Sequence, residues 1–212
     1  ERVRLIAEVK RGSPSQGLFR ADLDPVAQAE TYAGAGAAAV SVLTDARHFH
    51  GSLDDLERVG RAVAVPVLRK DFIVDEYQLW EARAAGADAV LLIVAALEDA
   101  ALRDLLHAAK GAGLATLVEV HTAGELDRAL RLGAPVIGVN NRDLQTLATS
   151  LDASLALLPQ IPHGLLTVSE SGLASGADVA RVVAAGAHAV LVGETLLRAG
   201  DVAAKVRELS LR

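Results

Sequence analysis

The feature that most constrains the fold of this chain is a short pattern that recurs about every 50 residues. In each copy a glycine precedes an apolar, β-branched run, as in 36–43, 86–93, 133–139 and 186–192. Glycine suits the end of a helix, and such a run suits a buried parallel strand. Because a βα unit takes roughly half of this spacing, the repeat predicts further strands in between. They are expected at 5–9, 66–70, 114–119 and 165–169, which makes eight strands.

The segments between these strands have the pattern of amphipathic helices. Helices are predicted over 25–35, 53–62, 76–85, 99–112, 123–132, 151–158, 177–185 and 202–209. Asp24, Ser52, Asp75, Thr122 and Ser175 stand at or near five of their starts, where such side chains cap a first turn. Eight strands alternating with eight helices favour a single (β/α)8 TIM barrel over an open doubly wound sheet. No Gly-x-Gly-x-x-Gly follows the first strand, which further weakens the dinucleotide-binding alternative.

Length and charge narrow the class of protein. The 212 residues suit one domain with a real core, so we expect a single catalytic domain over 1–212. A net charge of -6 argues against general attraction to nucleic acid. No apolar run approaches the roughly 18 residues of a membrane span, and we expect a soluble, cytoplasmic protein. The lack of Cys excludes disulfides and thiolate chemistry, and the lack of Met suggests a fragment or processed form.

Polar residues gather where the predicted strands end. In a (β/α)8 barrel these ends surround one mouth, where reactive groups collect. The residues concerned are Glu8, Lys10, Lys70, Glu119, Asn140, Arg142, Ser169, Ser171 and Gly193. Side chains two apart share a face of a strand, so Glu8 lies on the same side as Lys10, and Asn140 on the same side as Arg142. We therefore predict an active site to which six strands contribute.

The choice of residue types at this mouth points to proton transfer. The chain has 17 Arg and only four Lys, yet Lys10 and Lys70 both stand at strand ends. Arg cannot release its proton near neutral pH, whereas a buried Lys can. Glu119, among apolar neighbours, is a second acid–base candidate, although a structural ion pair with one of these lysines is the alternative. The only two Asn residues lie together at 140–141, at the end of a predicted strand, which suggests a role in the site. Chance clustering is the alternative.

Small residues follow the last two predicted strands. Ser171 and Gly172, and then Gly193 and Glu194, offer backbone N–H donors in the loops where such barrels usually hold a phosphate. The turn at 12–15 could also hold an anion beside Lys10, or be an ordinary turn. The six histidines form no plausible ligand set, so no metal is expected.

Six motifs occur in order along nearly the whole chain. They are Glu8-Val-Lys10-Arg-Gly-Ser13-Pro-Ser15, Leu68-Arg-Lys70-Asp-Phe72, Leu117-Val-Glu119-Val, Gly138-Val-Asn140-Asn-Arg142-Asp-Leu144, Ser169-Glu-Ser171-Gly172 and Val192-Gly193-Glu194. Together they resemble indole-3-glycerol phosphate synthase, a lyase of tryptophan biosynthesis. The resemblance implies that 1-(2-carboxyphenylamino)-1-deoxyribulose 5-phosphate closes its ring and loses carbon dioxide and water, giving indole-3-glycerol phosphate. It implies no cofactor.

The resemblance also implies roles for the residues at the mouth. Lys70 would be the general acid that protonates the ribulose carbonyl. Lys10 would pair with the substrate carboxylate, or itself serve as the acid. Glu119 would act in the proton transfers of dehydration, while Glu8 and Asn140 hold the network and the substrate hydroxyls. The implied substrate-binding residues are Ser13, Phe49, Phe72, Arg142, Leu144, Ser171, Gly172, Gly193 and Glu194.

Several alternatives stay open. Core packing accounts equally well for Phe49, Phe72 or Leu144, which would otherwise contact the aromatic ring of the substrate. The N-terminal helical extension of this family is expected to be missing here, with a loss of activity or stability. Phosphoribosylanthranilate isomerase is a weaker match because its chemistry relies on Cys. A Schiff-base barrel and a silent phosphate-binding barrel remain rivals, and the sequence leaves open whether the protein is a monomer or joins another tryptophan-pathway enzyme.

Overall fold

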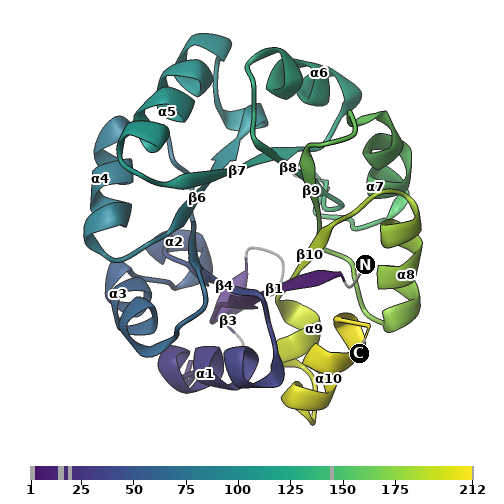
Figure 1. Ribbon diagram of the computed structural model, residues 1–212. Coiled ribbons are helices and arrows are strands. Elements are labelled where there is room, and N and C mark those ends of the chain that lie inside the picture. The colour runs from purple at the N-terminus through teal and green to yellow at the C-terminus, as the bar shows by residue number, and fades with distance from the viewer. Residues whose placement is uncertain (1–2, 14–16, 19–20, 144–145, 212) are drawn as a thin grey trace.

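Eight parallel strands form a closed barrel with helices around it (Figure 1). The computed structural model describes residues 3–13, 17–18, 21–143 and 146–211. The barrel strands are β1 (Arg4–Val9), β4 (Ala39–Leu43), β5 (Val67–Lys70), β6 (Ala89–Ile93), β7 (Ala115–Val120), β8 (Val136–Asn140), β9 (Leu166–Glu170) and β10 (Ala189–Val192). Each pairs in parallel with its neighbours, and β1 closes the barrel by pairing with both β4 and β10. The predicted (β/α)8 barrel is therefore confirmed.

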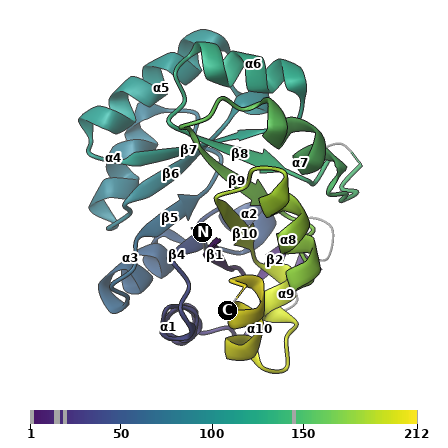
Figure 2. The same cartoon turned by 45° about the vertical axis from the view of Figure 1, so that its right-hand side comes forward.

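The outer helices follow the strands in turn (Figure 2). They are α1 (Pro25–Ala35), α3 (Leu53–Ala62), α4 (Glu76–Ala84), α5 (Asp99–Gly111), α6 (Ala123–Arg131), α7 (Asp152–Leu157), α8 (Gly176–Ala184) and α10 (Val202–Leu209). All five expected capping side chains accept a hydrogen bond from a first-turn N–H group, as Asp24 does from Val26. Asp75 and Ser175 form full capping boxes. Local polar contacts thus fix where these helices start.

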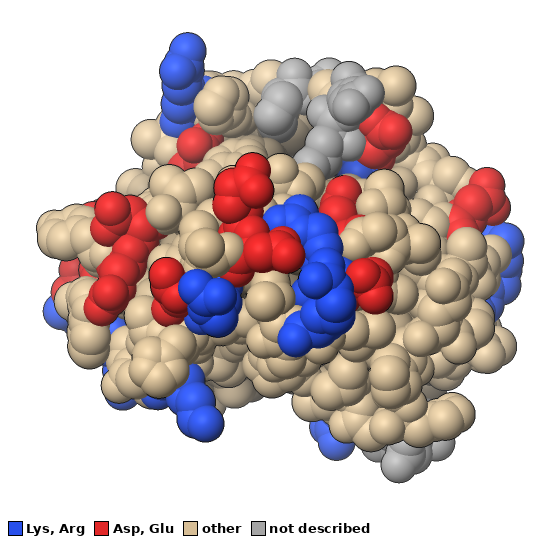
Figure 3. All heavy atoms as spheres, turned by 90° about the horizontal axis from the view of Figure 1, so that it is seen from above, with Lys and Arg blue, Asp and Glu red and all other residues tan. Residues whose placement is uncertain are grey.

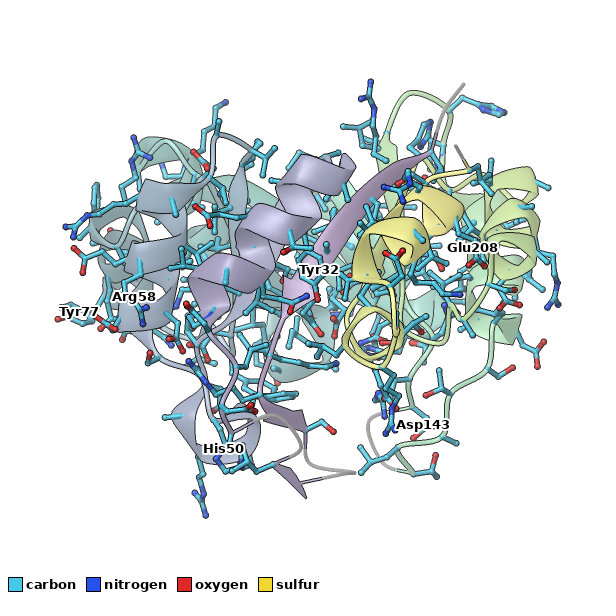
Figure 4. The ribbon with its side chains drawn as sticks, turned by 90° about the horizontal axis from the view of Figure 1, so that it is seen from below. Tyr32, His50, Arg58, Tyr77, Asp143 and Glu208 are labelled. Carbon is cyan, nitrogen blue, oxygen red and sulfur yellow. The ribbon has the colours of Figure 1, made fainter. Side chains whose placement is uncertain are left out.

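Several short elements were not expected from the sequence. The hairpin β2 (Gly12–Ser13) and β3 (Gly17–Leu18), helix α2 (Ala46–Phe49), the 3₁₀ turn η1 (Val94–Ala96) and helix α9 (Glu194–Leu197) all follow the C-terminal ends of barrel strands. A second 3₁₀ turn, η2 (Leu158–Gln160), extends α7. Viewed from the side, His50 after α2 and Asp143 after β8 lie at the same end of the barrel (Figure 4). These elements build the rim of the mouth.

Two apolar clusters hold the structure together. The larger lies between the strands and the helices, and Tyr32 of α1 belongs to it, with its hydroxyl donating to the backbone carbonyl of Glu8 at 3.3 Å (Figure 4). The smaller cluster fills the inside of the barrel. Its buried members are Leu68, Leu91, Ile93, Leu117, Val168 and Leu191. Because side chains alternate along a strand, most of the strands supply both clusters, while β4 supplies only the larger one.

Charge on the outside of the barrel is mixed in sign. Over the side of α5 and α6, acidic and basic side chains lie among each other (Figure 3). Arg128 pairs with Asp99 at 2.6 Å, and Arg131 pairs with Asp127 at 3.0 Å. The exposed Arg131–Asp127 pair contributes little to stability, whereas Arg128 is partly buried and also donates to the backbone carbonyls of Val94 and Leu97. Within the described part of the chain, no helix is long and apolar enough to cross a membrane.

Candidate active site

A layer of charged side chains lies inside the barrel, just above the smaller apolar cluster. Strands β5, β7 and β9 each pass from an apolar inward residue to a charged one two positions later, as from Leu117 to Glu119. The Nζ atom of Lys70 lies 3.5 Å from Oε2 of Glu119 and 3.7 Å from Oε2 of Glu170. Both glutamates are only 1% exposed. In the same layer, the Nζ atom of Lys10 lies 2.8 Å from Oε1 of Glu8. The layer thus contains the predicted residues Glu8, Lys10, Lys70 and Glu119, together with Glu170.

Two glycines make room for the buried carboxylates. A Cβ atom on Gly138 would collide with the carboxyl group of Glu170 and lie 3.1 Å from Cδ1 of Leu117. One on Gly193 would collide with the carboxyl group of Glu8 and lie 3.1 Å from Nζ of Lys10. A side chain at either position would displace a carboxylate from the mouth. The glycines are therefore part of the site, one strand away from the groups they accommodate.

The charges in this layer shift one another's proton affinities. Burial alone would lower the pKa of Lys70, but the carboxylates of Glu119, Glu170 and Glu8 outweigh it and raise the pKa above its usual value. Burial, together with the charge of Glu119, raises the pKa of Glu170 to about 8, against the opposing effect of Lys70. Burial opposes ionisation of Glu8, yet Lys10, Lys70 and Arg142 lower its pKa. At neutral pH Lys70 is an ammonium, and Glu170 is mostly protonated.

Glu170 was overlooked in the sequence because it lies inside a motif interpreted as a phosphate loop. The expectation that Ser169 ends its strand at the mouth was wrong. Ser169 faces outward, where its hydroxyl lies 2.7 Å from that of Ser154 and accepts a hydrogen bond from Nδ2 of Asn141 at 3.1 Å. Strand β9 runs one residue further than predicted, and counting by two from the inward Val168 would have found Glu170.

The side chains of Asn140 and Asn141 make different contacts. The Oδ1 atom of Asn140 accepts a hydrogen bond from the backbone N–H of Arg142 at 3.0 Å. Asn141 donates to the backbone carbonyl of Ser171 at 3.0 Å and accepts from the backbone N–H of Ser154 at 3.0 Å. Asn141 thereby ties the loop after β9 to α7. Adjacent side chains on a strand point to opposite faces, which explains the division.

A cavity of about 280 Å³ opens beside the charged layer. Predicted site residues that line it are Glu8, Lys10, Lys70, Arg142, Ser171, Gly172, Gly193 and Glu194, and Glu170 joins them. Ser171 and Gly172 are both left-handed, with φ of 66° and 75°, and α9 begins directly after Gly193. The Nη2 atom of Arg142 lies 4.0 Å from Oε2 of Glu194. The structure therefore brings Lys10, Lys70, Glu170 and the two small-residue loops to one cavity, whereas Glu119 and Asn140 do not line it.

The predicted aromatic contacts lie elsewhere on the rim. The ring centroids of Phe49 and Phe72 are 6.5 Å apart, and Phe72 is 43% exposed. Ser13 is buried in β2. None of these three residues lines the 280 Å³ cavity. Leu144 lies outside the described residues.

His121 is a further site residue that the sequence did not predict. It comes directly after β7 and two residues after Glu119. Its Nε2 atom lies 3.4 Å from Oε1 of Glu119, and its Nδ1 atom lies 3.2 Å from Oε2 of Glu125 in α6. Burial alone would lower the pKa of His121, but Glu125 and Glu119 outweigh it and raise the pKa. A second cavity, of about 510 Å³, is lined by His121, Glu125, Asn140 and Arg142, among others. Among the described residues, no cluster of His, Asp and Glu could hold a metal ion.

The fold and the site together define a (β/α)8-barrel enzyme equipped for acid–base chemistry. The family model described as Indole-3-glycerol phosphate synthase matches residues 1–209. The chain belongs to the indole-3-glycerol phosphate synthase family.

Similar proteins agree with this membership. The chain is 53% identical over 209 residues to an indole-3-glycerol phosphate synthase of Laribacter hongkongensis, covering 98% of this chain and 80% of that protein. It is 56% identical over 194 residues to one of Pelodictyon phaeoclathratiforme, covering 92% and 76%. A solved 3-hexulose-6-phosphate synthase of Salmonella typhimurium superposes with a TM-score of 0.78 at 16% identity, covering 99% of this chain and 97% of that one. The last likeness concerns the fold alone.

Proposed function

We propose that this chain catalyses the reaction after which its family is named. 1-(2-Carboxyphenylamino)-1-deoxyribulose 5-phosphate closes its ring and loses carbon dioxide and water, which leaves indole-3-glycerol phosphate. The observation that best supports this proposal is the ammonium of Lys70 between two buried carboxyl groups, beside a cavity that ends in two small-residue loops. A single catalytic domain over 1–212 and a cytoplasmic location belong to the same proposal.

Ring closure needs an acid at the ribulose carbonyl. As the aromatic carbon that bears the carboxylate attacks, the carbonyl oxygen becomes an alkoxide, which is a stronger base than an amine. Lys70 can therefore give up a proton to it even though its pKa is raised. Lys10 would pair with the substrate carboxylate by leaving its partner Glu8, or would act as the acid itself.

Dehydration needs one group that gives a proton and one that takes a proton. Glu170, protonated at neutral pH, is suited to protonate the departing hydroxyl. Glu119, which faces the ammonium of Lys70, is suited to take the proton from the carbon next to the nitrogen. Two carboxyl groups in one layer thus supply opposite roles, with Glu8 and Asn140 holding the substrate hydroxyls.

The phosphate of the substrate would lie between the loops after β9 and β10. Ser171, Gly172 and the start of α9 bring backbone N–H groups to the wall of this cavity, where they would face a dianion, and Arg142 adds positive charge. Ser13, Phe49, Phe72 and Leu144 remain proposed contacts for the rest of the substrate. Because Phe49 and Phe72 lie outside the cavity, they would reach the aryl ring only across the rim of the mouth.

Turnover of the carboxyphenylamino substrate tests the proposal directly. We expect indole fluorescence to appear when the purified protein is mixed with this substrate. Absence of fluorescence would overturn the proposed reaction. Borohydride added during turnover separates the Schiff-base rival, because only a covalent imine on a lysine would be trapped.

A further inference from the structure

The proposed reaction takes up one proton for each substrate converted, and this inference rests on that proposed function. Ring closure adds a proton to the carbonyl oxygen, and dehydration adds another to the departing hydroxyl. Loss of carbon dioxide from the carboxylate involves no proton. Only the carbon next to the nitrogen returns one. A proton must therefore enter the site from solvent in every cycle.

The acid–base layer has little contact with solvent of its own. Glu119 and Glu170 are almost fully buried, and the apolar cluster of the barrel interior closes the layer from below. Substrate in the 280 Å³ cavity would cover the same groups from above, because Lys70 and Glu170 line that cavity. A proton path that stays open during catalysis must therefore reach the layer from the side.

His121 lies on such a side path. Its ring stands between the buried Glu119, at 3.4 Å from Nε2, and the partly exposed Glu125, at 3.2 Å from Nδ1. The Oε2 atom of Glu125 also accepts a hydrogen bond from the backbone N–H of His121 at 2.7 Å, and Thr122 caps the N–H of Glu125 at 3.2 Å. These bonds hold the carboxylate of Glu125 beside the ring. His121 and Glu125 line the 510 Å³ cavity and not the one beside Lys70.

We propose that His121, held by Glu125, carries protons from the 510 Å³ cavity to Glu119. At the end of a cycle Lys70 and Glu170 have each lost a proton, and Glu119 returns to Lys70 the proton that it took from carbon. The imidazolium then passes its Nε2 proton to Oε1 of Glu119, which hands a proton on to Glu170. The ring is left neutral with its remaining proton on Nδ1, shared with Glu125. Because Nε2 is buried against Glu119, the neutral ring then turns about its Cβ–Cγ bond, so that the unprotonated nitrogen faces the 510 Å³ cavity and solvent there restores the lost proton. The 3.4 Å separation shortens to a hydrogen bond with a small side-chain rotation, as contacts in ligand-free sites often do. His121 acts through Glu119 and touches no substrate.

The charges around His121 favour a protonated ring. Glu119 on β7 and Glu125 on α6 face the ring, and both raise its pKa, while burial and Lys70 on β5 lower it. Arg142 and Asp143, after β8, line the same cavity. The net effect is a raised pKa, so the ring keeps its proton to a higher pH than a free imidazole and loses it as the pH rises further. The alkaline limb of the kcat profile should therefore report this group.

The main test replaces His121 and follows kcat against pH. We expect His121→Asn to lower kcat about 10-fold with an unchanged KM, a smaller loss than that of a group touching substrate. The alkaline limb set by His121 should disappear. In His121→Ala, added imidazole should restore kcat. The matched control is His107→Asn on the exposed face of α5, which should change nothing.

Two outcomes would overturn the relay. One is a His121→Asn enzyme with the kcat and pH profile of the parent; the other is a folded His121→Ala enzyme that imidazole does not restore. A measurement without turnover separates this proposal from the reaction itself. By NMR, the His121 ring should titrate above 6.5, its usual value, and Glu125→Gln should lower its pKa. A parent ring titrating at or below 6.5 contradicts the relay, whether or not the protein turns over substrate.

Discussion

The two layers of side chains inside the barrel come from the same strands, yet they differ in chemistry. The lower layer is apolar, with Leu68 and Leu117 among its members. The upper layer, two residues further along, holds Lys70 and Glu119 in ionic contact. The lower layer excludes water, so the charges above it act in a medium of low dielectric. The apolar layer should therefore set stability, while the charged layer sets the reaction.

The largest effect should come from removing a charge of the upper layer. We expect Lys70→Ala and Glu119→Gln each to lower kcat by at least about 10²-fold with little change in KM, because a proton transfer is lost. Steady-state kinetics on the fluorescent product measures both. Lys110→Ala, on the exposed end of α5, is the control and should match the parent. Near-full kcat in either variant would show that its assigned role is wrong.

The next effect should fall on stability. Leu117→Ala removes buried methyl groups from the lower layer and should cost about 3 kcal/mol, which lowers Tm by roughly 6–12 °C. Leu166→Ala is the matched control, because Leu166 begins β9 but is 56% exposed, and it should stay within about 0.5 kcal/mol. Thermal unfolding compares the two. Equal losses of Tm would contradict the division between the layers.

The smallest effect should depend on pH. Folding raises the pKa of Glu170 from 4.5 to about 8, so the stability gained by its protonated form is complete below about pH 4.5 and lost as the pH rises through about 8. Gln cannot ionise. Glu170→Gln should therefore raise Tm at pH 9 by about 2–4 °C, for roughly 1 kcal/mol, and by less at pH 6. The same change of Tm at both values would show that Glu170 does not titrate as described.

Much of the architecture was predictable because its signals are local. The glycine-led apolar repeat located the barrel strands, and capping residues such as Asp24 and Asp75 located helix starts. The short α2 and α9 were not predictable, since four residues carry too little periodicity. Their place at the mouth depends on the closed barrel instead.

The candidate site was predictable only in part. Lys10, Lys70 and Glu119 were found because unusual residue types stood at predicted strand ends. Glu170 and His121 were missed for a different reason. The sequence neighbours of each suggest an ordinary loop. Glu170 is recognised as a site residue by its contact with Lys70, and His121 by its contact with Glu125, and both partners lie on other elements. Such contacts appear once the strands are placed side by side.

The space that Gly138 and Gly193 leave for neighbouring carboxyl groups limits which substitutions this site can accept over time. Each carboxyl group occupies volume that the neighbouring strand gives up, so Gly138 belongs with Glu170, and Gly193 with Glu8. Enlarging one member demands shrinking the other. Substitutions at these positions are therefore expected to arise as compensating pairs, and a redesign of the pocket has to treat each pair as one unit.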